Sequence, residues 1–191
     1  RCLPSRLRLQ ARALDDHPDI AAVGSAYYEV LVEHMSVRMC EVPATHEVCL
    51  EGLLQGRSVF LHSSVMFRRR LKGQPIRYDE SYPEAQDQRL WIYLASRSRL
   101  GSVSRPLVVA LRNDPNSITG RRGLINEVRL KTRLIIAARD ELGGSGRQMR
   151  SAIARSISQT IASRLRRYLR ETLMRSLGEA RVNSLLWGWR G

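Results

Sequence analysis

Four side chains of the types that bind zinc lie close together in the first third of the chain. They are His34, Cys40, His46 and Cys49, which fall within 16 residues. Structural zinc sites usually contain two cysteines separated by two residues, and this group has no such pair. His34 and Cys49 also fall on the apolar faces of expected helices, where burial explains them more simply. We therefore expect no metal and no cofactor.

A second group of reactive types consists of carboxylates. Asp79, Glu80 and Glu84 are close enough in sequence to act together, but acidic residues also stabilise the N-terminus of a following helix. The aspartates of residues 15–19 and the four histidines lie in the first half, yet no nucleophile–base signature joins them. These patterns favour a protein that is not an enzyme and that has no small-molecule substrate.

A glycine-rich segment, Gly143-Gly144-Ser145-Gly146, precedes an expected helix. The free amides of that helix are suited to holding a phosphate, and Arg147 and Arg150 lie nearby. Glycine clusters more often mark loops, and the phosphate-binding pattern G-x-x-x-x-G-K does not occur in the sequence. The segment is therefore interpreted as a hinge.

Clusters of basic side chains indicate phosphate binding. Each cluster alone would suit a solvated face, but together they favour contact with a polyanion. Trp91 and Tyr168 lie near basic residues and are candidates for stacking on bases. The residues expected to bind nucleic acid are Arg68, Arg69, Arg70, Lys72, Arg121, Arg122, Arg147, Arg150, Arg164, Arg166, Arg167 and Arg170.

The positive charge is concentrated in the second half of the chain. The net charge is +14 and the sequence pI is about 11.0. Residues 1–90 hold 12 basic and 12 acidic side chains, whereas residues 91–191 hold 20 and 6. This asymmetry predicts a neutral region that forms the packed body of the protein and a basic region that binds a polyanion. Nucleic acid is the first candidate, because neutralising phosphates releases counterions, and an anionic membrane surface is the second.

Arginine is the basic residue at all but two positions, Lys72 and Lys131. The planar guanidinium group of arginine binds phosphate through two hydrogen bonds, although a GC-rich genome would also favour arginine over lysine.

The longest uncharged apolar run, Ser58–Phe67, is too short to span a membrane. Residues 1–14 contain four arginines and no acid, which resembles an organelle transit peptide or a basic arm. The three cysteines fit a reducing compartment, and we expect a mitochondrial interior.

Three helices are predicted in the first half. Acids and a proline at 15–20 precede apolar positions at a spacing of three and four, which predicts a helix to about Met39. Pro43 opens a short helix that ends at Gly56, with Val48, Cys49, Leu53 and Leu54 facing inward. A helix after Pro83 carries Leu90, Trp91 and Leu94.

Strands are predicted only as short pieces. Ser58–Phe67 suits either a buried strand or a buried helix, because periodicity does not separate the two. Ser96–Ser104 is polar and is expected to be a loop. Pro106–Leu111 is expected to be a short strand or one helical turn, and Asn113–Gly120 has the composition of a loop.

The C-terminal helices have the clearest patterns. An apolar stripe predicts a helix from Leu124 to Leu142. Apolar residues then recur every four positions from Met149 to Leu177, with arginines on the opposite side. One face of this long helix is expected to contact protein and the other solvent or phosphate. Residues 185–189 are expected to form an apolar anchor.

The sequence therefore predicts a mainly α protein: a small helical domain, with possible short strands at 58–67 and 106–112, then a hinge and a long amphipathic helix. Its expected parts are a basic arm (1–14), a neutral-to-basic globular domain (15–142), the hinge (143–146) and an arginine-rich helix with an apolar tail (147–191).

The expected function is that of a non-enzymatic structural component of a large ribonucleoprotein, such as an organellar (mitochondrial-type) ribosomal protein. Its partners would be rRNA-like RNA and neighbouring protein subunits. The alternatives are an accessory structural subunit of a mitochondrial membrane complex (respiratory or ATP synthase) and a viral coat or nucleocapsid protein.

Overall fold

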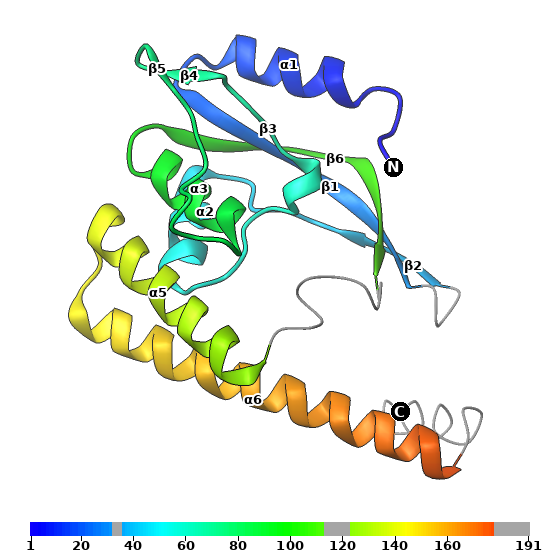
Figure 1. The fold of residues 1–191 in the computed structure, drawn as a ribbon. Coiled ribbons are helices and arrows are strands. Elements are labelled where there is room, and N and C mark those ends of the chain that lie inside the picture. The colour runs from blue at the N-terminus through cyan, green and yellow to red at the C-terminus, as the bar shows by residue number, and fades with distance from the viewer. Residues whose placement is uncertain (32–35, 113–122, 178–191) are drawn as a thin grey trace.

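The computed structural model describes residues 1–31, 36–112 and 123–177, and it shows a mixed α/β fold (Figure 1). Helices make up 50% of the structure and strands 24%. The main sheet is mixed and contains a long parallel pair of strands. The expectation of a mainly α protein, with only short strands possible at 58–67 and 106–112, is therefore wrong.

Strand β1 (Ile20–Leu31) is the centre of the main sheet. On one edge it pairs antiparallel with β3 (Met66–Phe67) over its first half and with β2 (Ser36–Cys40) over its second half. On the other edge it pairs parallel with β6 (Arg99–Arg112). The long parallel pair joins residues that lie 78 to 81 positions apart in the sequence.

Helices cover both faces of this sheet (Figure 1). Helix α1 (Arg6–Asp16) lies on one face, and α2 (His46–Leu54) and α3 (Gln86–Ala95) lie on the other. The main core lies between the sheet and α2 and α3, around Trp91, which is 0% exposed. Burial of Leu90, Trp91 and Leu94 confirms the expected inward face of α3.

The helix expected over residues 20–39 is wrong, because that segment forms β1 and β2. Residues 21–26 are all buried, since both faces of the sheet are covered at this point. A strand buried on both faces reads as a continuous apolar run without alternation. Gly24 fits there because it lies directly against the ring of Phe60, where a Cβ atom would overlap.

Besides α3, the segment between α2 and α5 contains a 3-10 turn, short strands and the long strand β6. Residues 58–67 form neither a long strand nor a buried helix, but a single 3-10 turn, η2 (His62–Ser64), followed by β3. The expected loop at Ser96–Ser104 is also wrong, because β6 begins at Arg99. Of the short strand and the helical turn expected at Pro106–Leu111, the structure has a strand, but these residues belong to the long strand β6. The loop expected at Asn113–Gly120 lies outside the described residues.

The two C-terminal helices confirm the sequence prediction. Helix α5 (Leu124–Leu142) packs its buried Leu134, Ile135 and Ala138 against α2 and α3. Helix α6 (Gly146–Leu177) runs antiparallel along α5, on the side away from the sheet (Figure 1). The expected apolar anchor at 185–189 lies outside the described residues.

Of residues 143–146, expected as a hinge, residues 143–145 form the turn between α5 and α6, and Gly146 is the first residue of α6. Gly143 has a φ of 77°, the left-handed conformation that commonly ends a helix. The Ser145 amide donates to the Gln148 side chain at 2.9 Å, and the Gln148 amide donates to the Ser145 hydroxyl at 3.2 Å. This reciprocal capping box fixes where α6 begins.

Candidate nucleic-acid interface

Arg68 has an internal role in the structure. Its guanidinium donates to the main-chain oxygens of Leu14, His17 and Ile20, the last at 2.8 Å. These carbonyls belong to the end of α1, the loop after it and the first residue of β1, and a cation at the end of a helix satisfies acceptors that the helix leaves unpaired. Arg68 thus joins α1 to the sheet through its Nε and Nη2 groups.

The neighbouring basic residues are exposed on a small hairpin. Strands β4 (Arg70–Leu71) and β5 (Gln74–Pro75) pair antiparallel, and the turn between them contains Lys72 with a φ of 49°. Arg69, Arg70 and Lys72 are exposed, and Arg70 donates to the Gly73 oxygen at 2.9 Å. The hairpin therefore presents three cations to solvent near one end of α1 (Figure 1).

The remaining predicted residues that the structure describes belong to α6. Arg147, Arg150, Arg166 and Arg167 are exposed, and none of them makes an ion pair within the described parts of the chain. Arg164 instead pairs with Glu127 of α5 at 2.9 Å. The predictions for Arg121, Arg122 and the side chain of Arg170 fall outside the described residues.

Helix α6 is the most strongly basic element. From Gly146 to Arg170 its sequence contains seven arginines and no acidic residue, and the first acid is Glu171. The β4–β5 hairpin lies on the opposite side of the sheet from α6 (Figure 1). The structure therefore separates the predicted cations into two basic surfaces, one on the hairpin and one along α6.

Of the two aromatic residues considered for base stacking, only Tyr168 is at the surface. Trp91 is 0% exposed, and its ring contacts those of Phe60 and Phe67 edge to face, with centroids 6.0 and 6.2 Å apart. Tyr168 lies on α6 and is 66% exposed. Trp91 is therefore a core residue, and its position in sequence near basic residues had no bearing on its environment.

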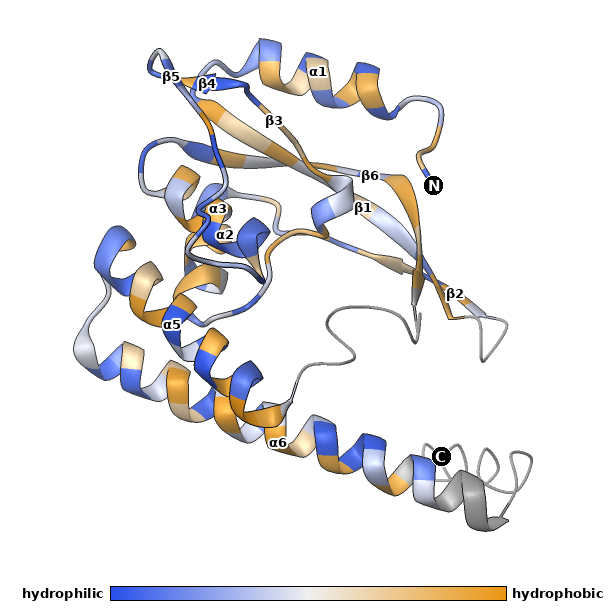
Figure 2. Ribbon diagram, in the orientation of Figure 1, coloured by the Kyte–Doolittle hydropathy of each residue, from blue (hydrophilic) through white to orange (hydrophobic). Residues whose placement is uncertain are grey.

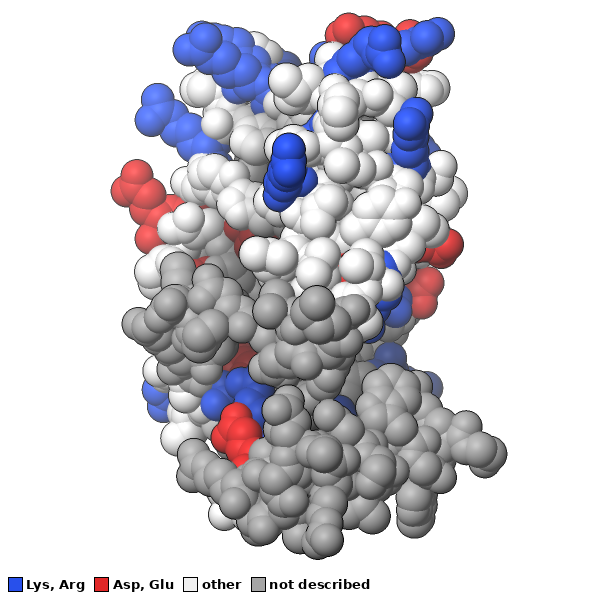
Figure 3. Space-filling view, turned by 90° about the vertical axis from the view of Figure 1, so that its right-hand side faces the viewer, with Lys and Arg blue, Asp and Glu red and all other residues white. Residues whose placement is uncertain are grey.

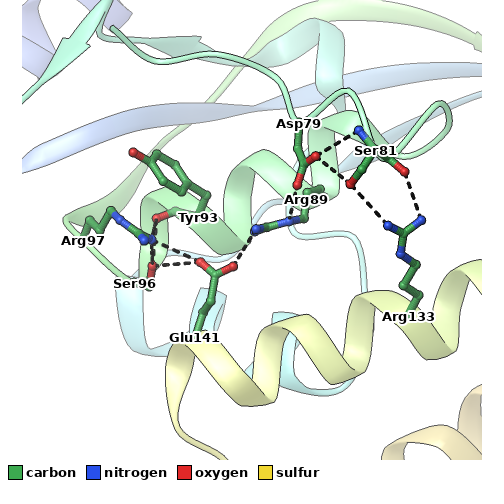
Figure 4. A network of polar contacts seen from close by, with 8 residues as sticks. All are labelled: Asp79, Ser81, Arg89, Tyr93, Ser96, Arg97, Arg133 and Glu141. Atoms are coloured by element: carbon green, nitrogen blue, oxygen red, sulfur yellow. Dashed lines mark hydrogen bonds and ion pairs between the residues drawn. The ribbon is translucent and has the colours of Figure 1, made fainter. Parts of the chain in front are cut away.

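Several other arginines take part in an internal network between α3 and α5 (Figure 4). Arg89 contacts Asp79 at 3.2 Å and Glu141 at 2.7 Å, and Glu141 also pairs with Arg97 at 3.1 Å. Hydrogen bonds from Ser81 lower the pKa of Asp79, and Arg89 contributes to the same shift. This network fixes α5, which in turn carries α6.

On the α5 side, Arg133 continues the network. It donates to the Ser81 oxygen at 3.0 Å, and its guanidinium lies 4.0 Å from the centre of the Tyr82 ring. The role of Arg133 could not be predicted from the sequence, because its partner Ser81 lies 52 residues earlier in the chain.

A second ion-pair group joins α5 to α6. Glu127 accepts from Lys131 and Arg164, each at 2.9 Å, and Lys131 also donates to the buried Thr160 hydroxyl at 2.8 Å. Burial alone would raise the pKa of Glu127, but these two cations outweigh it and lower the pKa. The two helices therefore pack through a satisfied polar group as well as through apolar contacts.

The residues considered for zinc have separate environments. Cys49 is 0% exposed, and burial raises the pKa of its thiol to about 12. His46 lines a cavity of about 510 Å³ between α1 and β6, and its Nδ1 accepts from the Leu100 amide at 3.2 Å. Within the described ranges, no three metal-binding side chains lie together, and His34 falls outside those ranges.

The charges on the surface are unevenly spread. Figure 3 shows the end of the molecule that lies to the right in Figure 1, with Lys and Arg mainly along its upper part and a largely uncharged middle. Exposed apolar residues of the sheet include Val37, Met39 and Leu111, which is 72% exposed. The basic surfaces are therefore local features and not a uniform coat.

None of the helices in the described residues combines the length and the apolar character that crossing a bilayer requires. No protein-family profile matches the chain, and no curated protein sequence matches it. The case for function therefore depends on the two basic surfaces and on the core that positions them.

Proposed function

We propose that this protein is a non-enzymatic structural component of a large ribonucleoprotein, such as a mitochondrial-type ribosome, and that it binds RNA through α6 and the β4–β5 hairpin. One observation carries the proposal: α6 holds exposed arginines that have no acidic partner among the described residues, and the helix packs along α5 as far as Arg164. A rigid cationic surface of this kind binds phosphates with little loss of conformational entropy.

The use of acidic residues elsewhere strengthens this argument. Asp79, Glu127 and Glu141 are each engaged by arginine or lysine inside the fold. The arginines of α6 that have no such partner repel one another until an external polyanion neutralises them. RNA phosphates supply closely spaced negative charge, and their binding releases counterions.

Sedimentation of the native assembly with and without RNase tests the proposal. We expect the protein to sediment in a large particle in mitochondrial extract and to move to light fractions after RNase treatment. The purified chain should bind single-stranded RNA with an affinity that falls steeply as salt rises. RNA binding that does not change with salt, or no RNA binding at low salt, would contradict the proposal.

A second candidate is an accessory structural subunit of a mitochondrial membrane complex. It is favoured by the large apolar side chains that α6 exposes, among them Leu165 and Tyr168. In that case the arginines would pair with acidic subunits or lipid headgroups. RNase would then leave the sedimentation of the native assembly unchanged, and this separates the two candidates.

A further inference from the structure

We infer that the outer face of α6 is a docking surface for an acidic amphipathic helix of a neighbouring protein. The inference goes beyond RNA binding and does not depend on it. It concerns a strip that we call the α6 ridge, made of Ile161, Leu165, Tyr168 and Leu169.

The α6 ridge consists of large apolar side chains that face solvent. Ile161 is 49% exposed, Leu165 54%, Tyr168 66% and Leu169 49%. They recur at positions i, i+4, i+7 and i+8, so the helical period places them on one face. The buried side chains of α6, Ala152 and Thr160, face the rest of the molecule instead. Figure 2 shows hydrophobic residues continuing on α6 past the end of α5.

The spacing of the ridge matches one side of a helix pair. Positions separated by four and then three residues form the narrow seam by which two helices pack together. From Ile161 to Leu169 the ridge extends about 12 Å, at 1.5 Å per residue. This apolar strip accommodates about two turns of a partner helix, and a partner that also reaches Arg150 needs about five turns, or about 28 Å.

The charges beside the ridge specify an acidic partner. Arg150 and Arg147 precede Ile161 by 11 and 14 residues, so they lie on the same side of α6 to within about 40°. Arg166 is exposed and lies about 60° around the helix from Leu169, at one edge of the ridge. No acidic residue occurs between Gly146 and Arg170, so the charges on this face are all positive. Charge complementarity therefore requires carboxylates on the partner.

The same features disfavour other occupants. A second copy of the chain would bring arginines against arginines, which costs energy at an interface. A bilayer requires a long apolar face, but the first half of this face carries Arg147, Arg150 and the exposed Ser151 and Ser158. RNA bases stack on aromatic rings and on arginine, which would leave the aliphatic Ile161, Leu165 and Leu169 uncovered. An acidic amphipathic helix satisfies both the ridge and the arginines.

Site-specific photocrosslinking in the native host tests this inference. The photoreactive residue p-benzoylphenylalanine replaces Leu165, and the crosslinked product is identified by mass spectrometry. The matched control places the same residue at Leu7, which is 69% exposed on α1. We expect position 165, and not position 7, to crosslink to one protein segment with apolar residues at helical spacing and acidic residues beside them.

A synthetic peptide of the crosslinked segment is then titrated against the purified full chain. Leu165→Ser and Tyr168→Ser should each weaken its binding at least about tenfold, as expected for central contact residues. Both side chains are exposed, so circular dichroism and the unfolding midpoint should remain those of the wild type. Arg150→Gln should weaken peptide binding mainly at low salt.

Several outcomes would overturn the inference: crosslinks from position 165 to RNA, to lipid or to a second copy, or a yield no higher than at position 7. A crosslinked segment without acidic residues would also count against it. Leu165→Ser keeps every arginine and the Tyr168 ring, so its RNA affinity should not change. Loss of RNA binding and loss of peptide binding are therefore separate failures.

Discussion

At the residue scale, a single buried amide joins three elements. Gln10 of α1 is 0% exposed, and its Nε2 donates to the Val23 oxygen at 2.9 Å and to the Ser64 oxygen at 2.7 Å. Its Oε1 accepts from Arg6 at 3.0 Å. All the hydrogen-bonding groups of the amide are therefore used, which is the condition under which a buried polar side chain stabilises a fold.

Replacing Gln10 by leucine should destabilise the protein by about 2–4 kcal/mol, because two buried carbonyls lose their donors. Urea unfolding followed by circular dichroism measures the free energy of unfolding. The control is Arg8→Ala, on the exposed side of the same helix, which should change it by less than about 0.5 kcal/mol. Equal effects of the two substitutions would show that the amide contacts contribute little.

Glu127 predicts how stability depends on pH. Its pKa is lowered in the folded protein, so its contribution is fully present above the unfolded value of 4.5 and is lost as pH falls through the folded pKa. The wild type should therefore lose stability on going from pH 5.5 toward pH 3. Glu127→Gln should be less stable at pH 7, by about 1–2 kcal/mol, and should lose less over the acid range. Unfolding midpoints at pH 7, 5.5 and 3 measure both effects, and parallel curves for the two proteins would contradict the argument.

Cysteine reactivity reports directly on the core. Cys49 is buried with a thiol pKa of about 12, whereas Cys2 is exposed. At pH 8 a thiol reagent such as iodoacetamide should modify Cys2 within minutes and leave Cys49 intact until the protein unfolds, because only the thiolate reacts. Peptide mapping by mass spectrometry distinguishes the sites. Rapid modification of Cys49 in the native protein would place α2 outside the core.

At the element scale, the position of β1 explains which parts of the fold could be predicted from the sequence. Helix α5 packs on α2 and α3, and α6 lies on α5 at the surface, so both helices keep exposed polar residues between apolar ones and show the helical period. Strand β1 is buried on both faces and shows no alternation, and the spacing of Ile20, Val23 and Tyr27 resembled that of a helix by chance. Its parallel partner β6 begins with polar residues, which suggested a loop.

The candidate interface, too, could be predicted from the sequence only in part. Clusters of arginine can be located in a sequence, but their partners cannot. Arg68 and Arg166 look alike as members of basic runs, yet Arg68 binds main-chain oxygens of α1 and Arg166 is exposed. The difference comes from tertiary contacts to residues about 50 positions away. Only α6, where acids are missing over 25 consecutive residues, could be predicted as basic whatever its packing.

Gly24 provides a test of how tightly β1 packs. Gly24→Ala should destabilise the protein by about 2–3 kcal/mol, because the added methyl group overlaps the Phe60 ring. Adding Phe60→Leu should recover part of this loss by removing the ring. Gly146→Ala is the control: its Cβ would lie at an ordinary 3.5 Å from Arg150, and the change should stay within about 0.5 kcal/mol. Chemical denaturation measures all four proteins, and no recovery in the double variant would show that another contact limits the site.

At the scale of the whole molecule, the fold divides its arginines between two uses. One set is bound internally and holds α1, α3, α5 and α6 in place: main-chain oxygens bind Arg68, and carboxylates bind Arg89 and Arg164. The other set is exposed without described acidic partners. These exposed arginines are the ones available to an external polyanion. Any polyanion that binds should respond to the exposed set and not to total charge.

Two variants with equal net charge test this division. The first replaces four exposed arginines of α6 by glutamine, at positions Arg147, Arg150, Arg166 and Arg167. The second replaces four exposed arginines outside the two basic surfaces, at positions Arg8, Arg57, Arg77 and Arg105. Each contact with single-stranded RNA contributes about 0.7 to the slope of log affinity against log salt, so the first variant should reduce that slope by about 3. The second should leave the slope nearly unchanged, and fluorescence anisotropy with labelled RNA from 50 to 300 mM salt measures both. Equal reductions would mean that the RNA responds to overall charge and not to α6.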